Sequence, residues 1–165
     1  MTKLQKIILL AMAGLLAVLL LAAGVAFATR QPPETVVGTF VPPEFDPNAQ
    51  VGTPQVSNPA YGTLELTPTA VVSMCADVTC ENNAALVYFT SHSGNQGWIK
   101  IKLTDAEGNL LGQSGLLRPG EYVESVYLDS APKENGLIVA KILIYEPDTY
   151  LSLGSASAQI SLTVK

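Results

Sequence analysis

The longest apolar segment of the chain lies near its N-terminus, at residues 7–28. This run, IILLAMAGLLAVLLLAAGVAFA, contains no charged or strongly polar side chain. As a helix it would span about 33 Å, close to the thickness of the hydrocarbon core of a bilayer. A helix can also satisfy its own backbone hydrogen bonds where no water is available. We therefore predict a single transmembrane helix at residues 7–28, preceded by a short cytoplasmic tail, residues 1–6.

The charges that flank this run predict its orientation. Lys3 and Lys6 precede it, and only Arg30 follows it closely, so the positive-inside rule places the N-terminus in the cytoplasm and the C-terminal domain outside the cell membrane. A secretory signal is the alternative, because Ala26-Phe27-Ala28 fits a small-x-small cleavage site and the protein would then be secreted after cleavage following Ala28. The length of the run favours the uncleaved anchor.

Residues 29–62 are predicted to form a Pro-rich linker. The segment 31–61 holds 7 of the 11 prolines, and proline fixes φ and removes a backbone donor, which disfavours a regular helix or a central strand. The linker also carries side chains that are too apolar for a purely solvated spacer: Val36, Val37, Phe40, Val41 and Phe45. We predict that it docks partly on the domain or on a partner, with Phe40 and Phe45 as contacts.

From Thr63 to the C-terminus, apolar and polar residues alternate with period two, which indicates an all-β domain at residues 63–165. In the clearest example, Ile99, Ile101 and Leu103 alternate with Trp98, Lys100 and Lys102. The predicted strands are 63–67, 70–76, 84–90, 97–104, 121–128, 136–145 and 157–164. About seven short antiparallel strands are typical of a β-sandwich.

Two segments between these strands have the composition of tight turns. Residues 105–109, DAEGN, predict a hairpin turn in which Gly108 or Asn109 has a positive φ. Residues 118–121, RPGE, predict a type II turn with Pro119 at its second position and Gly120 at its third.

The charge balance argues against nucleic acid as a partner. The chain has 9 basic and 14 acidic residues. Three of the basic residues precede residue 31, so the remainder of the chain is strongly acidic. Nucleic acid requires a clustered basic surface that neutralises phosphates, and the sequence does not predict one.

The two cysteines, Cys75 and Cys80, are the first candidates for special chemistry. Both would lie on the oxidising side of the membrane, where a disulfide is permitted. In a straight strand they would be about 16 Å apart, so pairing requires the chain to turn between them. A disulfide and two unpaired thiols both remain open. Cys-x4-Cys with a single distant histidine does not match a structural zinc site, and we predict no metal and no cofactor.

No combination of residues predicts catalysis. His92 lies in a polar loop beside Ser91 and Ser93, but neighbouring residues of one loop rarely achieve the geometry of a nucleophile and its base. Asp105, Glu107 and Asn109 imitate the start of a calcium loop, yet the position that should carry glutamate is Leu116. Glu146 and Asp148 are most simply a solvated turn. We therefore expect a protein that is not an enzyme.

One stretch of the chain resembles a known class of domain. Residues 98–103, 105–111 and 117–123 follow the order strand, D-x-x-G turn, short strand, L-x-P-G-E turn and strand. This order resembles the Ig-like or fibronectin-like domains of exported bacterial proteins. The chain as a whole, including VPPEFDPNAQ and YEPDTY, is similar to small uncharacterised membrane-anchored proteins of Gram-positive, clostridia-like bacteria, some of them associated with mobile elements. The resemblance implies an Ig-like β-sandwich and export, and no specific chemistry.

The function that we expect is therefore binding rather than catalysis. Trp98 shares its face with Lys100 and Lys102, so its ring either packs at the edge of the core or contacts a ligand or partner. We predict Lys100 and Lys102 as contacts of the same ligand or partner. Our leading hypothesis is a membrane-anchored extracytoplasmic binding or structural module, an accessory subunit of a cell-envelope or mobile-element-associated assembly with other envelope proteins as neighbours. The alternatives are a surface protein that binds cell-wall carbohydrate and a self-associating adhesin or matrix subunit.

Overall fold

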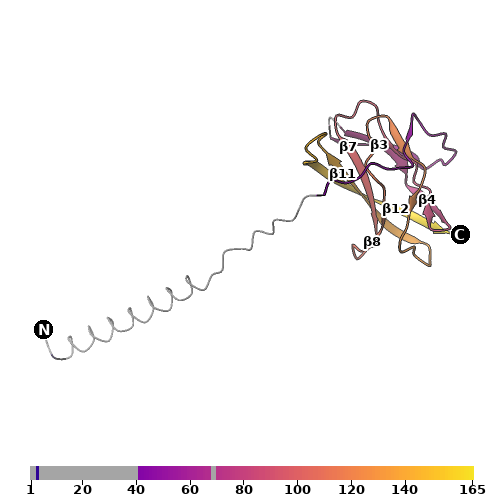
Figure 1. Cartoon of the computed structure of the whole chain (residues 1–165). Coiled ribbons are helices and arrows are strands. Elements are labelled where there is room, and N and C mark those ends of the chain that lie inside the picture. The colour runs from indigo at the N-terminus through magenta and orange to yellow at the C-terminus, as the bar shows by residue number, and fades with distance from the viewer. Residues whose placement is uncertain (1–2, 4–40, 68–69) are drawn as a thin grey trace. The chain divides into compact units, whose positions relative to one another are not determined.

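The computed structural model describes Lys3, residues 41–67 and residues 70–165 (Figure 1). The chain divides into two units at Phe40, and the second unit comprises residues 41–165. The predicted span 7–28 and Phe40 lie outside the described residues. Among the residues that the structure does describe, no helix is long and apolar enough to cross a membrane.

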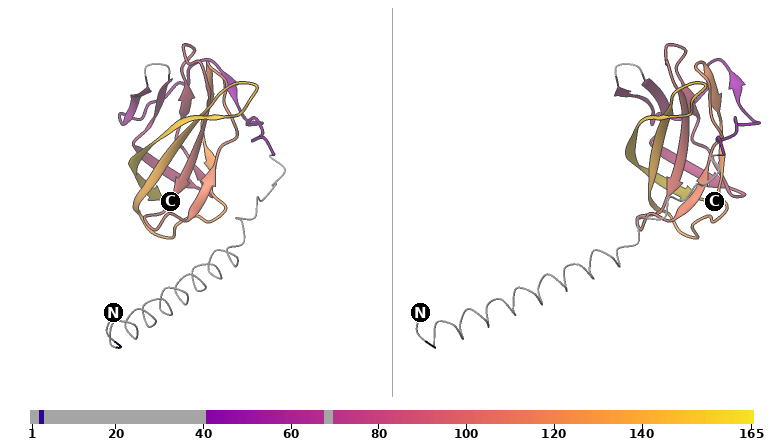
Figure 2. Two further views of the ribbon diagram at one scale, coloured as in Figure 1. Left: turned by 90° about the vertical axis from the view of Figure 1, so that its left-hand side faces the viewer. Right: turned by 60° about the vertical axis from the view of Figure 1, so that its left-hand side comes forward.

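Residues 41–165 form two β-sheets that face each other across one core (Figure 2). The five-stranded sheet has the order β1 (Gln50–Val51), β9 (Glu121–Val123), β6 (Phe89–Ser91), β3 (Ala70–Cys75) and β2 (Tyr61–Thr67). The seven-stranded sheet has the order β10 (Val126–Tyr127), β5 (Ala84–Ala85), β4 (Asp77–Glu81), β12 (Ser152–Val164), β11 (Gly136–Tyr145), β7 (Trp98–Thr104) and β8 (Leu110–Gln113). Of these strand pairs only β12 and β4 are parallel.

The alternation predicted from the sequence defines the inner faces of both sheets. In β7 the residues Ile99, Ile101 and Leu103 are fully buried, whereas Trp98, Lys100 and Lys102 are half-buried. The core also receives buried side chains from the other strands, among them Val72, Phe89, Val123, Ile142 and Leu162. Each such side chain stabilises the fold by about 1.5–3 kcal/mol relative to its exposed state. The all-β class is therefore confirmed, with a sandwich-like pair of sheets.

The predicted number of seven strands is wrong, because residues 41–67 and 70–165 contain twelve. Two predicted strands bend and contribute to both sheets, as strands do at the corners of packed sheets. The predicted strand 84–90 is β5 and β6, separated by residues 86–88, where Tyr88 has a φ of 48°. The predicted strand 121–128 is likewise β9 and β10. None of the seven predicted strands lies at the positions of β1, β4 and β8.

Both predicted turns are present. Gly108 has a φ of 90°, and the Asp105 carboxylate accepts hydrogen bonds from the backbone N and the side-chain Nδ2 of Asn109, both at 2.7 Å. Gly120 has a φ of 82°, and the Glu121 N–H donates to the Arg118 carbonyl oxygen at 3.1 Å. Only glycine adopts such a φ without strain, so these two glycines fix the directions of the chain on either side of β8.

Part of the predicted linker is docked on the domain, and we call residues 44–53 the strap. The Leu116 N–H donates to the Glu44 carbonyl oxygen at 2.8 Å, and the Asp46 N–H donates to the Leu116 carbonyl oxygen at 3.0 Å. Farther along, β1 pairs with β9. Docking is thus confirmed for Phe45, which forms a β-bridge with Leu116, whereas Val41 is 79% exposed.

Candidate functional site

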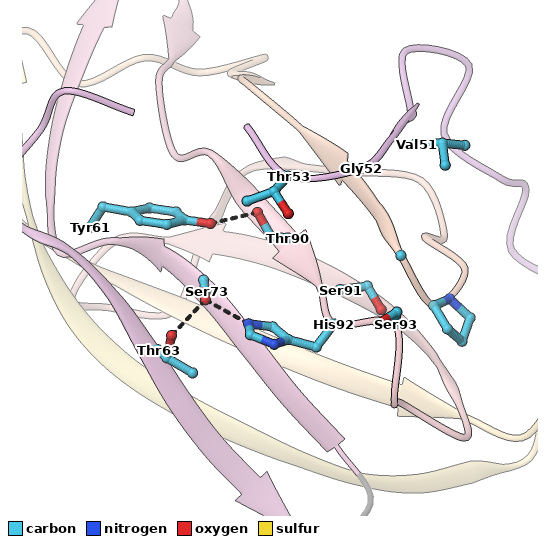
Figure 3. Close-up of a pocket in the computed structure, with 12 residues that line it drawn as sticks. Val51, Gly52, Thr53, Tyr61, Thr63, Ser73, Thr90, Ser91, His92 and Ser93 are labelled. Carbon is cyan, nitrogen blue, oxygen red and sulfur yellow. Dashed lines mark hydrogen bonds between the residues drawn. The ribbon is translucent and has the colours of Figure 1, made fainter. Parts of the chain in front are cut away.

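A pocket of about 640 Å³ opens on the outer face of the five-stranded sheet (Figure 3). Its floor is made by β2, β3 and β6, its rim by the strap, by the loop after β6 and by the turn before β9. Seven of its twelve lining residues carry a hydroxyl group. The lining residues are Val51, Gly52, Thr53, Tyr61, Thr63, Ser73, Thr90, Ser91, His92, Ser93, Pro119 and Gly120.

The floor of the pocket follows from strand alternation and register. In β3 and β6 the side chains of Val72 and Phe89 enter the core, so Ser73 and Thr90 point to the opposite face. The register places Thr63 of β2 opposite Ser73 and Ser73 opposite Thr90. These three residues form one line across three strands, which we call the hydroxyl row.

Hydrogen bonds orient the hydroxyl row. The Ser73 Oγ lies 2.8 Å from the Thr63 Oγ1 and 2.8 Å from the His92 Nε2 (Figure 3). The Tyr61 hydroxyl lies 2.9 Å from the Thr90 Oγ1, which itself donates to the Tyr88 carbonyl oxygen at 3.1 Å. Because a threonine hydroxyl has one hydrogen, Tyr61 donates to Thr90. Such connected networks hold their members in fixed orientations.

Asn95 fixes the loop that carries His92. Its side chain accepts from the Val71 N–H at 2.7 Å and donates to the Val71 carbonyl oxygen at 2.8 Å. It also donates to the Ser91 Oγ at 3.0 Å, and it is 7% exposed. A buried amide with every contact satisfied is costly to displace, so this loop is a firm wall of the pocket.

The side chains that line the pocket are uncharged groups and the imidazole of His92. Among its lining residues there is no carboxylate, lysine or arginine. Hydroxyl groups both donate and accept hydrogen bonds. The pocket therefore matches an uncharged ligand with hydroxyl or amide groups better than it matches an ion.

His92 is placed differently from the sequence-based expectation. Its hydroxyl partner is Ser73, which is distant in the sequence, rather than its neighbours Ser91 and Ser93. A serine–histidine contact is one element of nucleophilic catalysis, which also needs a third group that orients the imidazole. Here the Ser73 oxygen is shared with Thr63, and its residue is 3% exposed. The arrangement is that of a hydrogen-bond network.

Trp98 and Phe45, two predicted contact residues, pack against each other. Their ring centroids are 4.8 Å apart in an edge-to-face arrangement, and the Tyr150 ring lies 5.2 Å from Trp98 on another side. The Arg118 guanidinium lies 3.6 Å above the Phe45 ring. Aromatic and cation–π contacts of this kind stabilise packing. They place Trp98 at the docking site of the strap.

Lys100 and Lys102 lie on the outer face of the seven-stranded sheet, as their alternation predicted. Burial lowers the pKa of Lys100, and the neighbouring charge of Lys102 lowers it further, while Asp46 of the strap acts in the opposite direction. A third lysine, Lys141 of β11, was not among the predicted residues and lies directly opposite Lys102. Lys102 and Lys141 meet only because β7 pairs with β11, and no local sequence pattern predicts this strand pairing.

Cys75 and Cys80 are free, buried thiols in the structure. Cys75 ends β3 and Cys80 lies in β4, so the chain passes from one sheet to the other between them. Burial raises the pKa of both thiols, and the charge of Asp77 adds to the effect at Cys75. Of the two states that the sequence left open, the structure describes the unpaired one.

The remaining acidic candidates lie in turns. Hydrogen bonds from Asn109 lower the pKa of Asp105, which caps its own hairpin turn. The Glu146 carboxylate accepts from the Thr149 Oγ1 at 2.6 Å. Within residues 41–67 and 70–165, no group of three or more His, Cys, Asp or Glu side chains is arranged to hold a metal ion.

The sequence matches no protein-family model, and it matches no curated protein.

Proposed function

We propose that this protein is a non-enzymatic, membrane-anchored extracytoplasmic module that binds an uncharged, hydroxyl-rich ligand in the pocket of the five-stranded sheet. Glycan of the cell wall is the ligand class that best fits this chemistry and this location. The observation that carries the proposal is the pocket itself, whose floor is the hydroxyl row and whose lining holds no acid, lysine or arginine. Its volume of about 640 Å³ falls within the range of small-ligand sites.

The cellular setting rests on the sequence. The apolar run 7–28 and its flanking lysines support an N-terminal anchor with the β-domain outside the membrane. N-terminal sequencing of the protein recovered from membranes tests this setting, because an anchor retains Met1 or Thr2, whereas a cleaved signal leaves Thr29 first. The resemblance at residues 98–123 supports an Ig-like sandwich. A domain that is tethered to the membrane in this way would have other envelope proteins as its neighbours.

Titration of the full-length protein with a neutral oligosaccharide tests the pocket. In mild detergent, calorimetry with N,N′,N″-triacetylchitotriose and with maltotriose should detect binding of at least one of the two. Thr63→Val keeps the shape of the side chain and removes one hydroxyl of the row, and should weaken binding about tenfold, the equivalent of one hydrogen bond. Thr104→Val, on the opposite sheet, is the matched control. A folded protein that binds neither sugar would contradict the proposal.

A second candidate function, self-association, is favoured by the edge of β12. Strand β4 pairs only with residues 161–164 of β12, so residues 152–160 have no strand on that side among the described residues. Residues 149–164 carry no charge, and Leu153 is 51% exposed. Natural edges are usually short or charged because open edges recruit other strands. Concentration-dependent dimers in sedimentation, abolished by Ser157→Lys, would support this function, and a monomer at all concentrations would exclude it.

A further inference from the structure

Three lysines converge on the outer face of the seven-stranded sheet. Lys102 of β7 and Lys141 of β11 are direct partners in the antiparallel register, and Lys100 lies two residues from Lys102 on the same face. Directly opposite residues of such a pair have Cβ atoms about 5 Å apart, and residues i and i+2 of a strand about 7 Å apart. We call these three residues the lysine face.

Among the described residues, no carboxylate forms an ion pair with the lysine face. Its neighbours in the strand ladders are uncharged, namely Gln113 beside Lys102, Leu143 beside Lys100 and Ser157 beside Lys141. In the part of the chain that the structure describes, the single ion pair joins Arg118 and Glu121. Asp46, the acid whose charge acts on Lys100, already accepts from the backbone N–H groups of Gly115 and Asn48.

In the absence of a ligand, the closeness of these three lysines is unfavourable for folding. Like charges placed directly opposite each other on a sheet are destabilising. Residues 31–165 contain all 14 acidic side chains of the chain, yet none of those that the structure describes forms an ion pair with these lysines. An anionic ligand would relieve the repulsion, because the three ammonium groups would then surround negative charge.

We propose that Lys100, Lys102 and Lys141 form a binding site for the phosphate groups of a linear anionic polymer. Lysine binds phosphate as a point charge and needs no fixed orientation. The site lies on an open sheet face, with Lys141 exposed and the other two half-buried, so it suits an extended ligand that passes across the strands. This site is separate from the neutral pocket and does not depend on it.

Binding to inorganic polyphosphate tests the site. Full-length protein in mild detergent should bind an immobilised polyphosphate chain at low salt, and affinity should fall about 20- to 40-fold between 50 and 200 mM salt, as expected for three released counter-ions. Lys102→Gln and Lys141→Gln should each weaken binding about tenfold. Lys133→Gln, which removes an exposed lysine from the segment between β10 and β11, is the control and should change affinity less than twofold.

Thermal unfolding distinguishes a role of the lysine face in binding phosphate from a role in stabilising the fold. Because each substitution removes a like-charge contact, Lys102→Gln and Lys141→Gln should unfold at the same temperature as the parent protein or higher. Equal losses of affinity in all three variants would overturn the proposal, since general charge would then explain binding. Binding to vesicles of phosphatidylglycerol but not to polyphosphate would also overturn it, because the face would then recognise a membrane surface.

Discussion

The outer faces of the two sheets differ in chemistry although both arise from the same alternation of side chains. On the five-stranded sheet, Thr63, Ser73 and Thr90 form a neutral row of hydroxyl groups, of which Ser73 and Thr90 are buried and Thr63 is exposed. On the seven-stranded sheet, Lys102 and Lys141 belong to a cluster of cations that is open to solvent on one side. Alternation therefore decides which residues face outward, whereas strand pairing decides which chemical groups meet.

The strap touches both faces. Residues 51–53 form part of the pocket rim, and Phe45 packs on Trp98, which lies on the same face of β7 as Lys100 and Lys102. Removing the strap should therefore affect the two faces unequally, because it supplies a wall to the pocket but no cation to the lysine face.

The strongest effect should come from Gly115→Ala. A Cβ atom at this position would lie 2.4 Å from the Asp46 Cα and 2.4 Å from its backbone N, so the strap must move away. We expect a loss of about 2–4 kcal/mol in the free energy of unfolding and a loss of sugar binding, with polyphosphate binding unchanged. Denaturant unfolding and the two titrations measure these effects.

Gly62→Ala is the matched control for this prediction. Gly62 lies in β2 with open space around its Cα, so a methyl group there should change neither stability nor binding. Loss of polyphosphate binding in Gly115→Ala would show that the two faces are not independent.

The next effect in size is that of Ser73→Ala on the hydroxyl row. The substitution leaves the His92 Nε2 and the Thr63 hydroxyl without their shared partner. A lost buried hydrogen-bond partner costs about 1–3 kcal/mol, and sugar binding should weaken in parallel. Ser93→Ala, an exposed residue of the same pocket, should have little effect on unfolding. Equal stability of the two variants would contradict the network.

A double-mutant cycle on Phe45 and Trp98 should give a smaller energy. Their edge-to-face contact predicts a coupling of about 1 kcal/mol between Phe45→Ala and Trp98→Ala. Strictly additive losses in denaturant unfolding would mean that the strap does not dock on Trp98. Sugar affinity at the pocket should respond to Phe45→Ala more than to Lys102→Gln.

The weakest effect concerns the cysteines, which lie where β3 of one sheet passes into β4 of the other. Burial raises the pKa of both thiols, so the folded state holds them protonated at a pH where the unfolded state releases protons. Their stabilising contribution is complete below the ordinary thiol pKa and declines as the pH rises through the folded-state value. Urea unfolding across this range should show a shallower decline in Cys75→Ala/Cys80→Ala. Rapid reaction of native protein with a thiol reagent at neutral pH would contradict their burial.

The sequence predicts the long strands and the turns of this domain because their signals are local. Alternation of Ile99, Ile101 and Leu103 defines β7, and Gly108 and Gly120 mark turns that require a positive φ. The bends within the predicted strands 84–90 and 121–128 have no such signal, since they depend on which sheet each half joins. For the same reason, the sequence predicts Lys100 and Lys102 as contacts but predicts neither the hydroxyl row nor the place of Lys141 beside them. Ser73 meets His92, and Lys102 meets Lys141, through pairing between distant segments.

Calorimetric titration of the full-length protein with neutral oligosaccharide in 500 mM salt is the decisive test of ligand binding in the pocket. High salt screens the lysine face and leaves neutral hydrogen bonding intact. We predict that binding persists at this salt concentration, weakens about tenfold in Thr63→Val and is unchanged in Lys102→Gln. Binding that disappears in salt, or that depends on Lys102 and not on Thr63, would contradict the assignment of the neutral ligand to the pocket.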